Sequence, residues 1–253
     1  MVGRRRLRNG CRASCIYGNH VKLIINFILY LNIISVFFLL LFSVAAAETF
    51  PPCLIEEGKV VSKNICYGTI NIGENFSYEG EFKNGQINGK GTFIWHKSDV
   101  YKNYVGEFKD DKLHGTGTLT WISGDISTGN FIDGEQEGFG KKIFKSGDVY
   151  TGEFKDNFFN GKGKYVDADG TVYEGEFKNE DFNGFGKIHY SNGDKYEGDW
   201  KNGKRDGKGL WSATDGSSYD GEWKEGLPHG KGIMTSSDGK KQESIFSQGE
   251  IKK

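Results

Sequence analysis

The sequence predicts an all-β protein: an elongated, twisted, antiparallel single-layer sheet of successive β-hairpins, preceded by an N-terminal hydrophobic helix. A motif of aromatic residues and glycines recurs every 23 residues, as Phe154, Phe177 and Trp200 show. A fixed period of roughly 20–50 residues is typical of repeat arrays. Glycine supplies 38 of the 253 residues, proline only 3, and 14% of the chain is aromatic. This composition indicates ordered turns between strands, because disordered segments contain few aromatic residues.

The chain begins with a basic leader, residues 1–22, followed by an uncharged and largely apolar segment, residues 23–47. This layout is typical of a signal peptide, with small residues before Glu48 as a cleavage site. The apolar segment is also long enough to span a bilayer, so an uncleaved transmembrane anchor is the alternative. Basic residues before the segment favour a cytoplasmic N-terminus in both cases. We therefore expect a single-pass membrane or secreted protein with its repeats on the non-cytoplasmic side.

Residues 48–77 are predicted to form an N-terminal capping segment, which contains Cys53 and Cys66. Two cysteines in an exported segment are most simply paired with each other, because an oxidising compartment favours disulfides. The alternative is two unpaired thiols in an ordinary strand. The two cysteines have no histidines nearby, so we expect no zinc site and no other metal site.

Residues 78–241 contain seven repeated units, and the first unit shows how each should fold. Tyr78 and Phe82 alternate with charged residues, which predicts a strand with one aromatic and one charged face. A turn is expected at 84–88, and a second alternating run follows at 89–95. Two such runs joined by a short Asn/Gly segment predict a β-hairpin. The links between units are too short for a helix, so the hairpins should form a meander.

The glycines and the charged residues of each unit have predicted structural roles. A position without a side chain lets the aromatic ring of the neighbouring strand lie flat over the backbone. Acidic and basic residues recur two positions apart, as in Glu81 and Lys83. We expect these pairs on the solvated face, where they help to fix the register and bind no ligand.

The segment Tyr-Glu-Gly-Glu-Phe-Lys-Asn-Gly-Gln-Ile-Asn-Gly-Lys-Gly-Thr-Phe at 78–93 resembles a MORN (membrane occupation and recognition nexus) repeat, and residues 196–209 are similar again. The resemblance covers about residues 78–240. The third repeat departs most: Ser127 replaces the tyrosine, and Lys142 stands where other repeats place a large apolar residue. Residues 242–253 are predicted to form a degenerate C-terminal cap, which would protect the open edge of the sheet.

The resemblance implies a recognition or scaffolding module that binds partners along an aromatic groove. We therefore expect a protein or peptide partner and no cofactor. The alternative for each ring is that it only packs on other rings of the array. The candidate partner-binding residues are Trp95, Trp121, Phe144, Tyr190 and Trp211.

The charge distribution restricts the choice of partner. The chain has 33 Lys and Arg and 34 Asp and Glu, and all six charged residues before Glu48 are basic. Residues 48–253 therefore carry 27 basic and 34 acidic residues, a net charge of −7. This balance disfavours nucleic acid and anionic lipid head groups. Direct binding to a phospholipid surface remains the alternative function that the family name suggests.

No group of residues indicates catalysis. The five histidines occupy separate contexts, and none shares a local motif with a nucleophile. The segment 167–170 contains only part of a calcium loop, and the recurring Gly-Lys-Gly lacks the ending of a phosphate-binding loop. MORN repeats occur beside lipid-kinase and methyltransferase domains, but here the last repeat ends within a few residues of the chain end. We therefore expect a non-enzymatic protein.

Overall fold

A computed structural model describes residues 50–252 of the 253-residue chain. The basic leader (1–22) and the hydrophobic segment (23–47) lie outside the described residues, so the helix, signal and anchor remain predictions. Among the described residues, none forms a helix long and apolar enough to cross a membrane.

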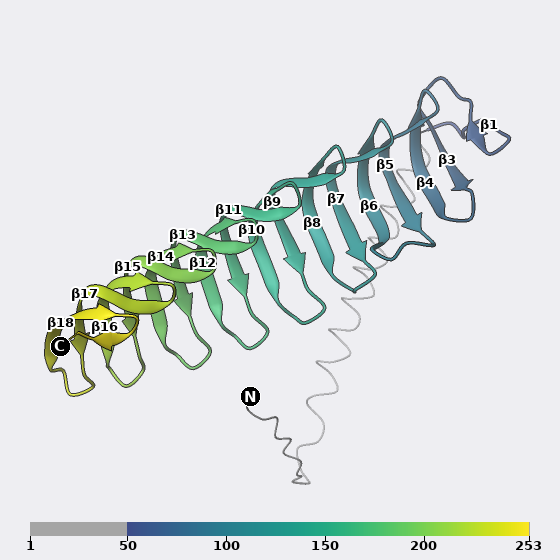
Figure 1. Ribbon diagram of the computed structural model, residues 1–253. Helices are drawn as coiled ribbons and strands as arrows, with labels where there is room; N and C mark the ends of the chain where they lie inside the picture. The colour runs from purple at the N-terminus through teal and green to yellow at the C-terminus, as the bar shows by residue number, and fades with distance from the viewer. Residues whose placement is uncertain (1–49, 253) are drawn as a thin grey trace, which may run out of the picture. The chain divides into compact units, whose positions relative to one another are not determined.

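The described residues fold almost entirely into strands that pair in chain order. From β3 to β19, each strand pairs antiparallel with the next, which makes one continuous ladder. In Figure 1 the hairpins follow one another along a twisted ribbon, with β3 near one end and β18 near the other. The predicted all-β sheet of successive hairpins is therefore confirmed. The strands are β1 (Ile55–Glu56), β2 (Lys59–Val60), β3 (Cys66–Ile72), β4 (Phe76–Lys83), β5 (Gln86–Trp95), β6 (Tyr101–Lys109), β7 (Lys112–Trp121), β8 (Ile126–Ile132), β9 (Glu135–Ile143), β10 (Val149–Lys155), β11 (Phe158–Val166), β12 (Val172–Lys178), β13 (Asp181–His189), β14 (Lys195–Lys201), β15 (Lys204–Ser212), β16 (Ser218–Lys224), β17 (Leu227–Thr235), β18 (Lys241–Ser247) and β19 (Glu250–Ile251).

The hairpin turn of the first repeat is shorter than the sequence predicts. Lys83 pairs with Gln86, so only Asn84 and Gly85 form the turn, and both have positive φ, 55° and 80°. Two left-handed residues are the signature of the tight turn that suits the twist of paired strands. The expected turn at 84–88 was therefore too long. A register shift between Gly80 and Phe82 accommodates the longer second strand, and the alternation pattern does not reveal it.

Buried tyrosines join neighbouring repeats. The Tyr78 hydroxyl donates to the carbonyl of Glu81 at 3.0 Å. The edge of its ring packs against Phe82 of the same repeat and Phe108 of the next, with both centroids at 5.1 Å. Since each tyrosine contacts two repeats, the aromatic core is a zipper along the array. The tyrosines with this hydroxyl contact are Tyr78, Tyr104, Tyr150, Tyr173, Tyr196 and Tyr219.

Close backbone approach explains the glycines beneath these rings. A methyl group on Gly175 would lie 2.5 Å from the Tyr173 hydroxyl oxygen and 2.5 Å from the Cα of Gly186. Both distances are shorter than any normal carbon contact, so a side chain at this position would force the strands apart. The Tyr173 ring comes from the same strand as Gly175, whereas a ring of the neighbouring strand was expected. The expectation does hold for Gly186, because the Tyr173 ring from the neighbouring strand lies over it.

The acidic residues of the repeats bind backbone groups. Carboxylate oxygens of Glu153, Asp199 and Glu222 accept backbone N–H bonds from residues nine positions later, at 3.1, 2.8 and 3.3 Å. These bonds occur beside glycines with positive φ in the second strand of each hairpin. The acidic side chains therefore stabilise the bend of the strand, which explains their recurrence without a ligand.

The third repeat interrupts the aromatic zipper. One core cluster extends from Val60 to Phe131 and a second from Tyr150 to Phe246. At the boundary between the two clusters, the Ser127 side chain is too short to cover Gly129 and Gly140. The Gln136 side chain lies over these two glycines in place of a tyrosine ring. The Gln136 side chain is 3% exposed and donates from Nε2 to the carbonyl of Thr128 at 3.0 Å. An amide with a backbone hydrogen bond therefore fills the space that a tyrosine occupies elsewhere.

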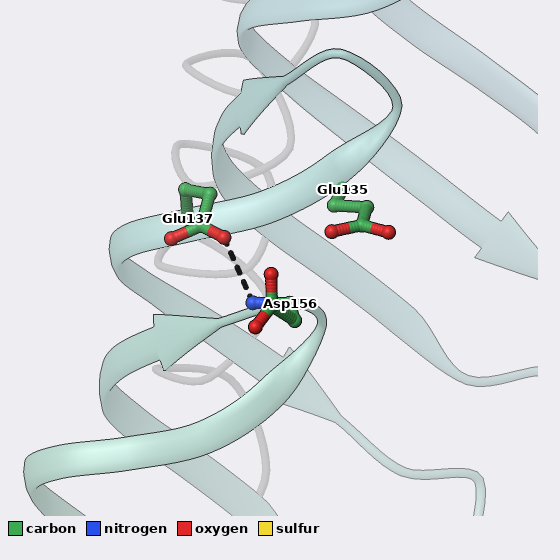
Figure 2. A group of neighbouring side chains, drawn as sticks. All are labelled: Glu135, Glu137 and Asp156. Atoms are coloured by element: carbon green, nitrogen blue, oxygen red, sulfur yellow. Dashed lines mark hydrogen bonds between the residues drawn. The ribbon is translucent and has the colours of Figure 1, made fainter.

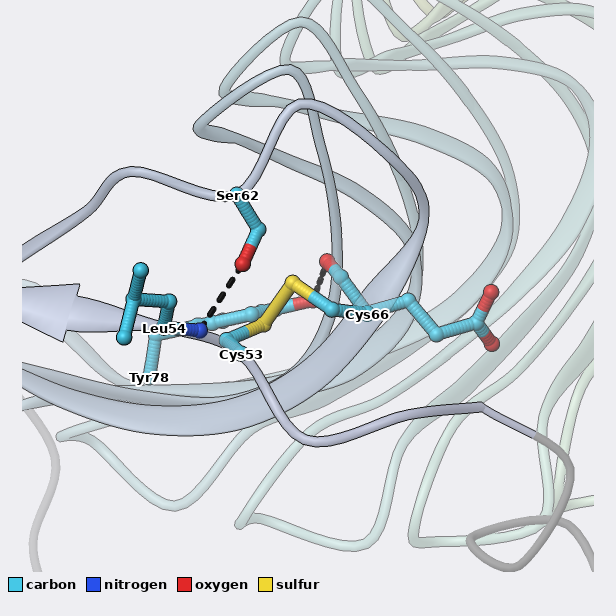
Figure 3. Close-up of a disulfide and its surroundings, with 6 residues drawn as sticks. Cys53, Leu54, Ser62, Cys66 and Tyr78 are labelled. Carbon is cyan, nitrogen blue, oxygen red and sulfur yellow. Dashed lines mark hydrogen bonds between the residues drawn. A yellow bond between two sulfur atoms is a disulfide. The ribbon is translucent and has the colours of Figure 1, made fainter.

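The N-terminal capping segment continues the sheet and adds a covalent link. Cys53 and Cys66 form a disulfide (Figure 3). Cys66 pairs with Phe82, the position that a glycine takes opposite Phe108 in the first full repeat. The backbone of Cys53 donates to the carbonyl of Tyr67 at 3.0 Å, so its chain runs beside β3. At the other end, β18 and the short β19 complete the ladder.

Candidate functional site

A row of half-buried aromatic side chains lies along one face of the N-terminal repeats. Ring centroids follow one another from Phe76 to Phe93 at 5.7 Å, to Trp95 at 4.7 Å, to Tyr101 at 5.4 Å and to Trp121 at 5.0 Å. Phe93 and Trp95 are two and four residues after a core glycine, so the period of a strand puts them on the same face as the buried tyrosine. Several of these rings also pack against the first core cluster. These rings form one continuous row, and we call this row and its continuation into the later repeats the aromatic groove.

A lysine continues this row in the third repeat. The ammonium nitrogen of Lys142 lies 5.1 Å from the ring centroid of Trp121, 4.9 Å from Phe144 and 5.8 Å from Phe159. All three distances fall within the range of cation–π attraction. Phe144 then leads to Tyr165, whose ring centroid is 6.1 Å away. The groove is therefore continuous across the repeat that interrupts the buried zipper.

A hollow of about 350 Å³ opens beside Lys142. Tyr165 lies in its wall and donates its hydroxyl to Asp148 at 3.1 Å. Burial and the neighbouring Asp148 carboxylate raise the pKa of Tyr165 to about 12, so the hydroxyl stays protonated near neutral pH. The lining residues are Lys142, Phe144, Phe159, Tyr165, Phe177, Glu180 and Phe182.

A second hollow, of about 430 Å³, is lined by residues of the fourth, fifth and sixth repeats. Tyr190 and Trp211 supply its aromatic surface, and Arg205 supplies a cation. The Arg205 guanidinium stacks over the Trp223 ring at 4.1 Å and donates to the carbonyl of Gly226 at 3.0 Å. Unlike Lys142, this cation already has a protein acceptor. The other lining residues are polar: Asp169, Thr171, Ser191, Asn192 and Asp194.

The five predicted contact residues are all half-buried and fall into three places in this groove. Trp95 and Trp121 belong to the N-terminal row, Phe144 lines the first hollow, and Tyr190 and Trp211 line the second. Each ring therefore packs on neighbours and also keeps an exposed surface. Sequence reasoning did not select the other groove residues. A comparison of equivalent positions in the repeats could have identified them. These residues are Phe93, Tyr101, Lys142, Tyr165, Phe182 and Arg205.

Three carboxylates gather near the hairpin turns of the third and fourth repeats (Figure 2). They belong to Glu135, Glu137 and Asp156. Glu137 accepts the backbone N–H of Asp156 at 2.8 Å, which links the two turns. The hydrogen bond to Asp156, together with the nearby negative charges, raises the pKa of Glu135. The group thus has a structural role at the surface, and exposed acidic groups alone do not define a metal site.

The geometry defines a class: a β-hairpin repeat array with a row of half-buried rings and two hollows along its aromatic face. The MORN repeat family model matches residues 78–100, 104–126, 128–149, 150–172, 173–195, 196–218 and 219–241. The chain belongs to the MORN repeat family, and the suspected resemblance is confirmed. No protein with a curated description matches the sequence.

Three solved structures show a distant likeness to this chain. The TCP domain of SAS-4 from Drosophila melanogaster, in complex with a proline-rich motif of Ana2, is 13% identical with a TM-score of 0.38, covering 62% of this chain and 84% of its own. The TCP10 domain of Danio rerio CPAP is 13% identical with a TM-score of 0.37, covering 74% and 93%. A virginiamycin B lyase from Staphylococcus aureus is 13% identical with a TM-score of 0.19, covering 74% and 72%. At these scores nothing about the function of this chain follows.

Proposed function

We propose that this protein is a non-enzymatic scaffold that binds an extended segment of a protein partner along its aromatic groove. One observation carries the proposal: half-buried rings run continuously from Phe76 to Trp121 and, through Lys142, to Tyr165. Aromatic side chains give large contact areas with little loss of conformational entropy, and they dominate the energetics of many protein interfaces.

An extended segment suits this surface better than a small molecule. The two hollows lie at separate points of the array, and the row of rings reaches the first of them at Phe144 and Tyr165. An extended peptide offers a side chain about every 6.6–7 Å on one face, so it meets successive rings. A single small ligand would fill one hollow and leave the rest of the row exposed.

The location and the excluded partners are part of the proposal. The uncharged segment 23–47 would export or anchor the protein, and the repeats would face the non-cytoplasmic side. A disulfide between Cys53 and Cys66 suits an oxidising compartment. The net charge of −7 over residues 48–253 disfavours nucleic acid and lipid head groups as partners.

A comparative pull-down tests the proposal. The baits are the full chain, a groove variant with Trp121→Ala and Trp211→Ala, and a control with Ile122→Ala and Leu210→Ala. The control changes the exposed chain neighbours of the same two tryptophans. We expect a partner that the full chain and the control retain and the groove variant loses. Equal retention by all three baits would contradict the proposal, as would sedimentation with phosphatidylserine vesicles in place of protein binding.

A further inference from the structure

We propose that Lys142 gives the groove a specificity for one carboxylate, so that the bound segment places an Asp or Glu side chain, flanked by apolar residues, over the third repeat. This inference rests on the proposed function, because it names the chemistry of the segment that the groove would bind. The partner is thus an extended peptide with a single acidic residue at its centre.

The position of Lys142 within its repeat is the first reason. The equivalent positions in the other repeats all hold large apolar side chains, so a lysine here is an exception within the molecule itself. Its ammonium group lies within 6 Å of three ring centroids, those of Trp121, Phe144 and Phe159. Three rings around one ammonium hold the cation in the groove, where it faces a bound segment. The apolar equivalents are Phe93, Leu119, Tyr165, Ile188, Trp211 and Met234.

The second reason is that this cation lacks a negative partner. In the part of the chain that the structure describes, the ion pairs involve other lysines, and none of them includes Lys142. Glu180 lines the same hollow without pairing with it. Beside Lys142, the indole nitrogen of Trp121 is buried and has no acceptor in the described residues. The half-buried Lys142 ammonium therefore has no negatively charged partner in the described residues, and an acceptor on a bound segment would supply one.

A single carboxylate fits this site better than a polyanion. Lys142 is one positive charge in a hollow that Glu180 also lines, within a body of net charge −7. A phosphate-rich ligand would meet repulsion from that field. One carboxylate on an otherwise apolar strand would avoid it, and its neighbours would contact the rings on both sides of Lys142. The electrostatic argument therefore favours an acidic residue within an apolar peptide.

The test begins with selection of short random peptides displayed on phage, using the full chain as the target. Enriched peptides are then synthesised with their acidic residue intact and with its amide counterpart. Binding is measured to the full chain and to Lys142→Met, which puts the residue of the seventh repeat at this position. Lys142→Arg retains the charge. Lys141→Met is the matched control, because it removes the same charge from the exposed neighbour on the opposite face.

We expect enrichment of peptides with one Asp or Glu between apolar residues. The acidic peptide should bind Lys142→Met about tenfold more weakly than the full chain, as for a partly desolvated charged hydrogen bond. Changing the peptide carboxylate to an amide should cost about the same factor in the full chain and little in Lys142→Met. Lys142→Arg and Lys141→Met should retain most of the affinity.

Two results would overturn the inference. If peptides bind the groove without an acidic preference, or if Lys142→Met and Lys141→Met behave alike, Lys142 sets no specificity, although the proposed function stands. If no peptide is enriched and the groove variant pulls down the same proteins as the full chain, both the proposed function and this inference fail.

Discussion

The third and fifth repeats have the same strand pairing but differ in the side chains that fill their cores. In the fifth repeat Tyr173 packs its ring flat on Phe182 at 3.7 Å and donates its hydroxyl to Glu176. In the third repeat Ser127 replaces the tyrosine, and Gln136, at the position equivalent to Phe182, bonds to the backbone instead. Both repeats keep the same antiparallel pairing between opposed glycines. Glycines and turns thus set the register, while the inner side chains are free to vary.

The third repeat therefore differs from the others both in its core, which affects the stability of the array, and in its groove, which affects what the surface can bind. The core divides into two clusters at the third repeat, which keeps the buried ring of Phe131 but lacks the buried tyrosine. The same repeat places a lysine in the groove above that division. The following predictions test whether the third repeat is a boundary inside an otherwise regular zipper.

The largest effect is expected from removing the disulfide with Cys53→Ser and Cys66→Ser. Closing a loop of about 14 residues contributes roughly 3 kcal/mol in the chain-entropy account. In a repeat array this stabilisation is local, because each repeat contacts only its neighbours. Hydrogen exchange should show fraying of the first one or two repeats and unchanged protection of repeats five to seven.

Loss of protection throughout the array would contradict the division at the third repeat. Free thiols at both positions in protein from its native compartment would rule out the disulfide itself, whatever the exchange pattern showed.

Gly175→Val tests the regular part of the zipper. The new side chain would meet backbone atoms of Gly186 and the hydroxyl of Tyr173, so we expect a loss of about 1–3 kcal/mol from overpacking. Denaturant unfolding measures it. Glu174→Val is the control, since it adds the same side chain at the exposed neighbour and removes only a surface ion pair with Lys164. Equal midpoints for the two variants would show that the close approach at Gly175 is unimportant.

A smaller difference in the free energy of unfolding is expected between the variants Tyr173→Phe and Ser127→Ala. The first removes the hydroxyl that donates to the carbonyl of Glu176 and should cost about 1 kcal/mol. The second removes a hydroxyl that makes no hydrogen bond in the described residues and should change unfolding less. If Ser127→Ala lowered the free energy of unfolding more than Tyr173→Phe, the Ser127 hydroxyl would take part in a stabilising polar network, which contradicts this account.

How much the sequence predicts differs between the sheet and the groove. The 23-residue period, the alternation and the glycines were sufficient for the all-β array of hairpins, because these signals are local and recur seven times. The expected turn at 84–88 was too long, because the register shift between Gly80 and Phe82 interrupts the alternation. Its sequence signature is the recurring positive-φ glycine, Gly89 in the first repeat, which was assigned to the regular second strand. The hydrophobic segment at 23–47 remains a prediction.

The groove was harder to predict, because its residues are defined by neighbours from other repeats. The alternation pattern places tryptophans and other aromatic residues near the ends of strands, so residues such as Trp95 and Trp121 could be predicted as groove residues. The role of Lys142 depends on the three rings around it, two of which come from adjacent repeats. Gln136 fills a space that exists only because Ser127 is small, and a linear pattern does not show such compensation.

The smallest effect concerns alkaline pH and Tyr165. Burial and Asp148 raise its pKa to about 12 in the folded protein, above the ordinary value of about 10. Because the folded state holds this proton more tightly, the stabilisation is complete below about pH 10 and is lost as pH rises towards 12. Unfolding at pH 8 and pH 11 should therefore show a steeper loss for the full chain than for Tyr165→Phe. Parallel losses would show that Tyr165 ionises freely.

The indole N–H signals of the five tryptophans test the central claim, that partners bind along the groove, most directly. Trp95, Trp121 and Trp211 have half-buried rings in the groove, whereas Trp200 and Trp223 are core residues whose indole N–H groups are hydrogen-bonded to the carbonyls of Gly186 and Gly209. In nitrogen-15 correlation spectra, addition of the tightest selected peptide should shift the groove signals, Trp121 most of all, and leave the two core signals in place. Saturating binding that leaves all three groove indoles unchanged would contradict the account.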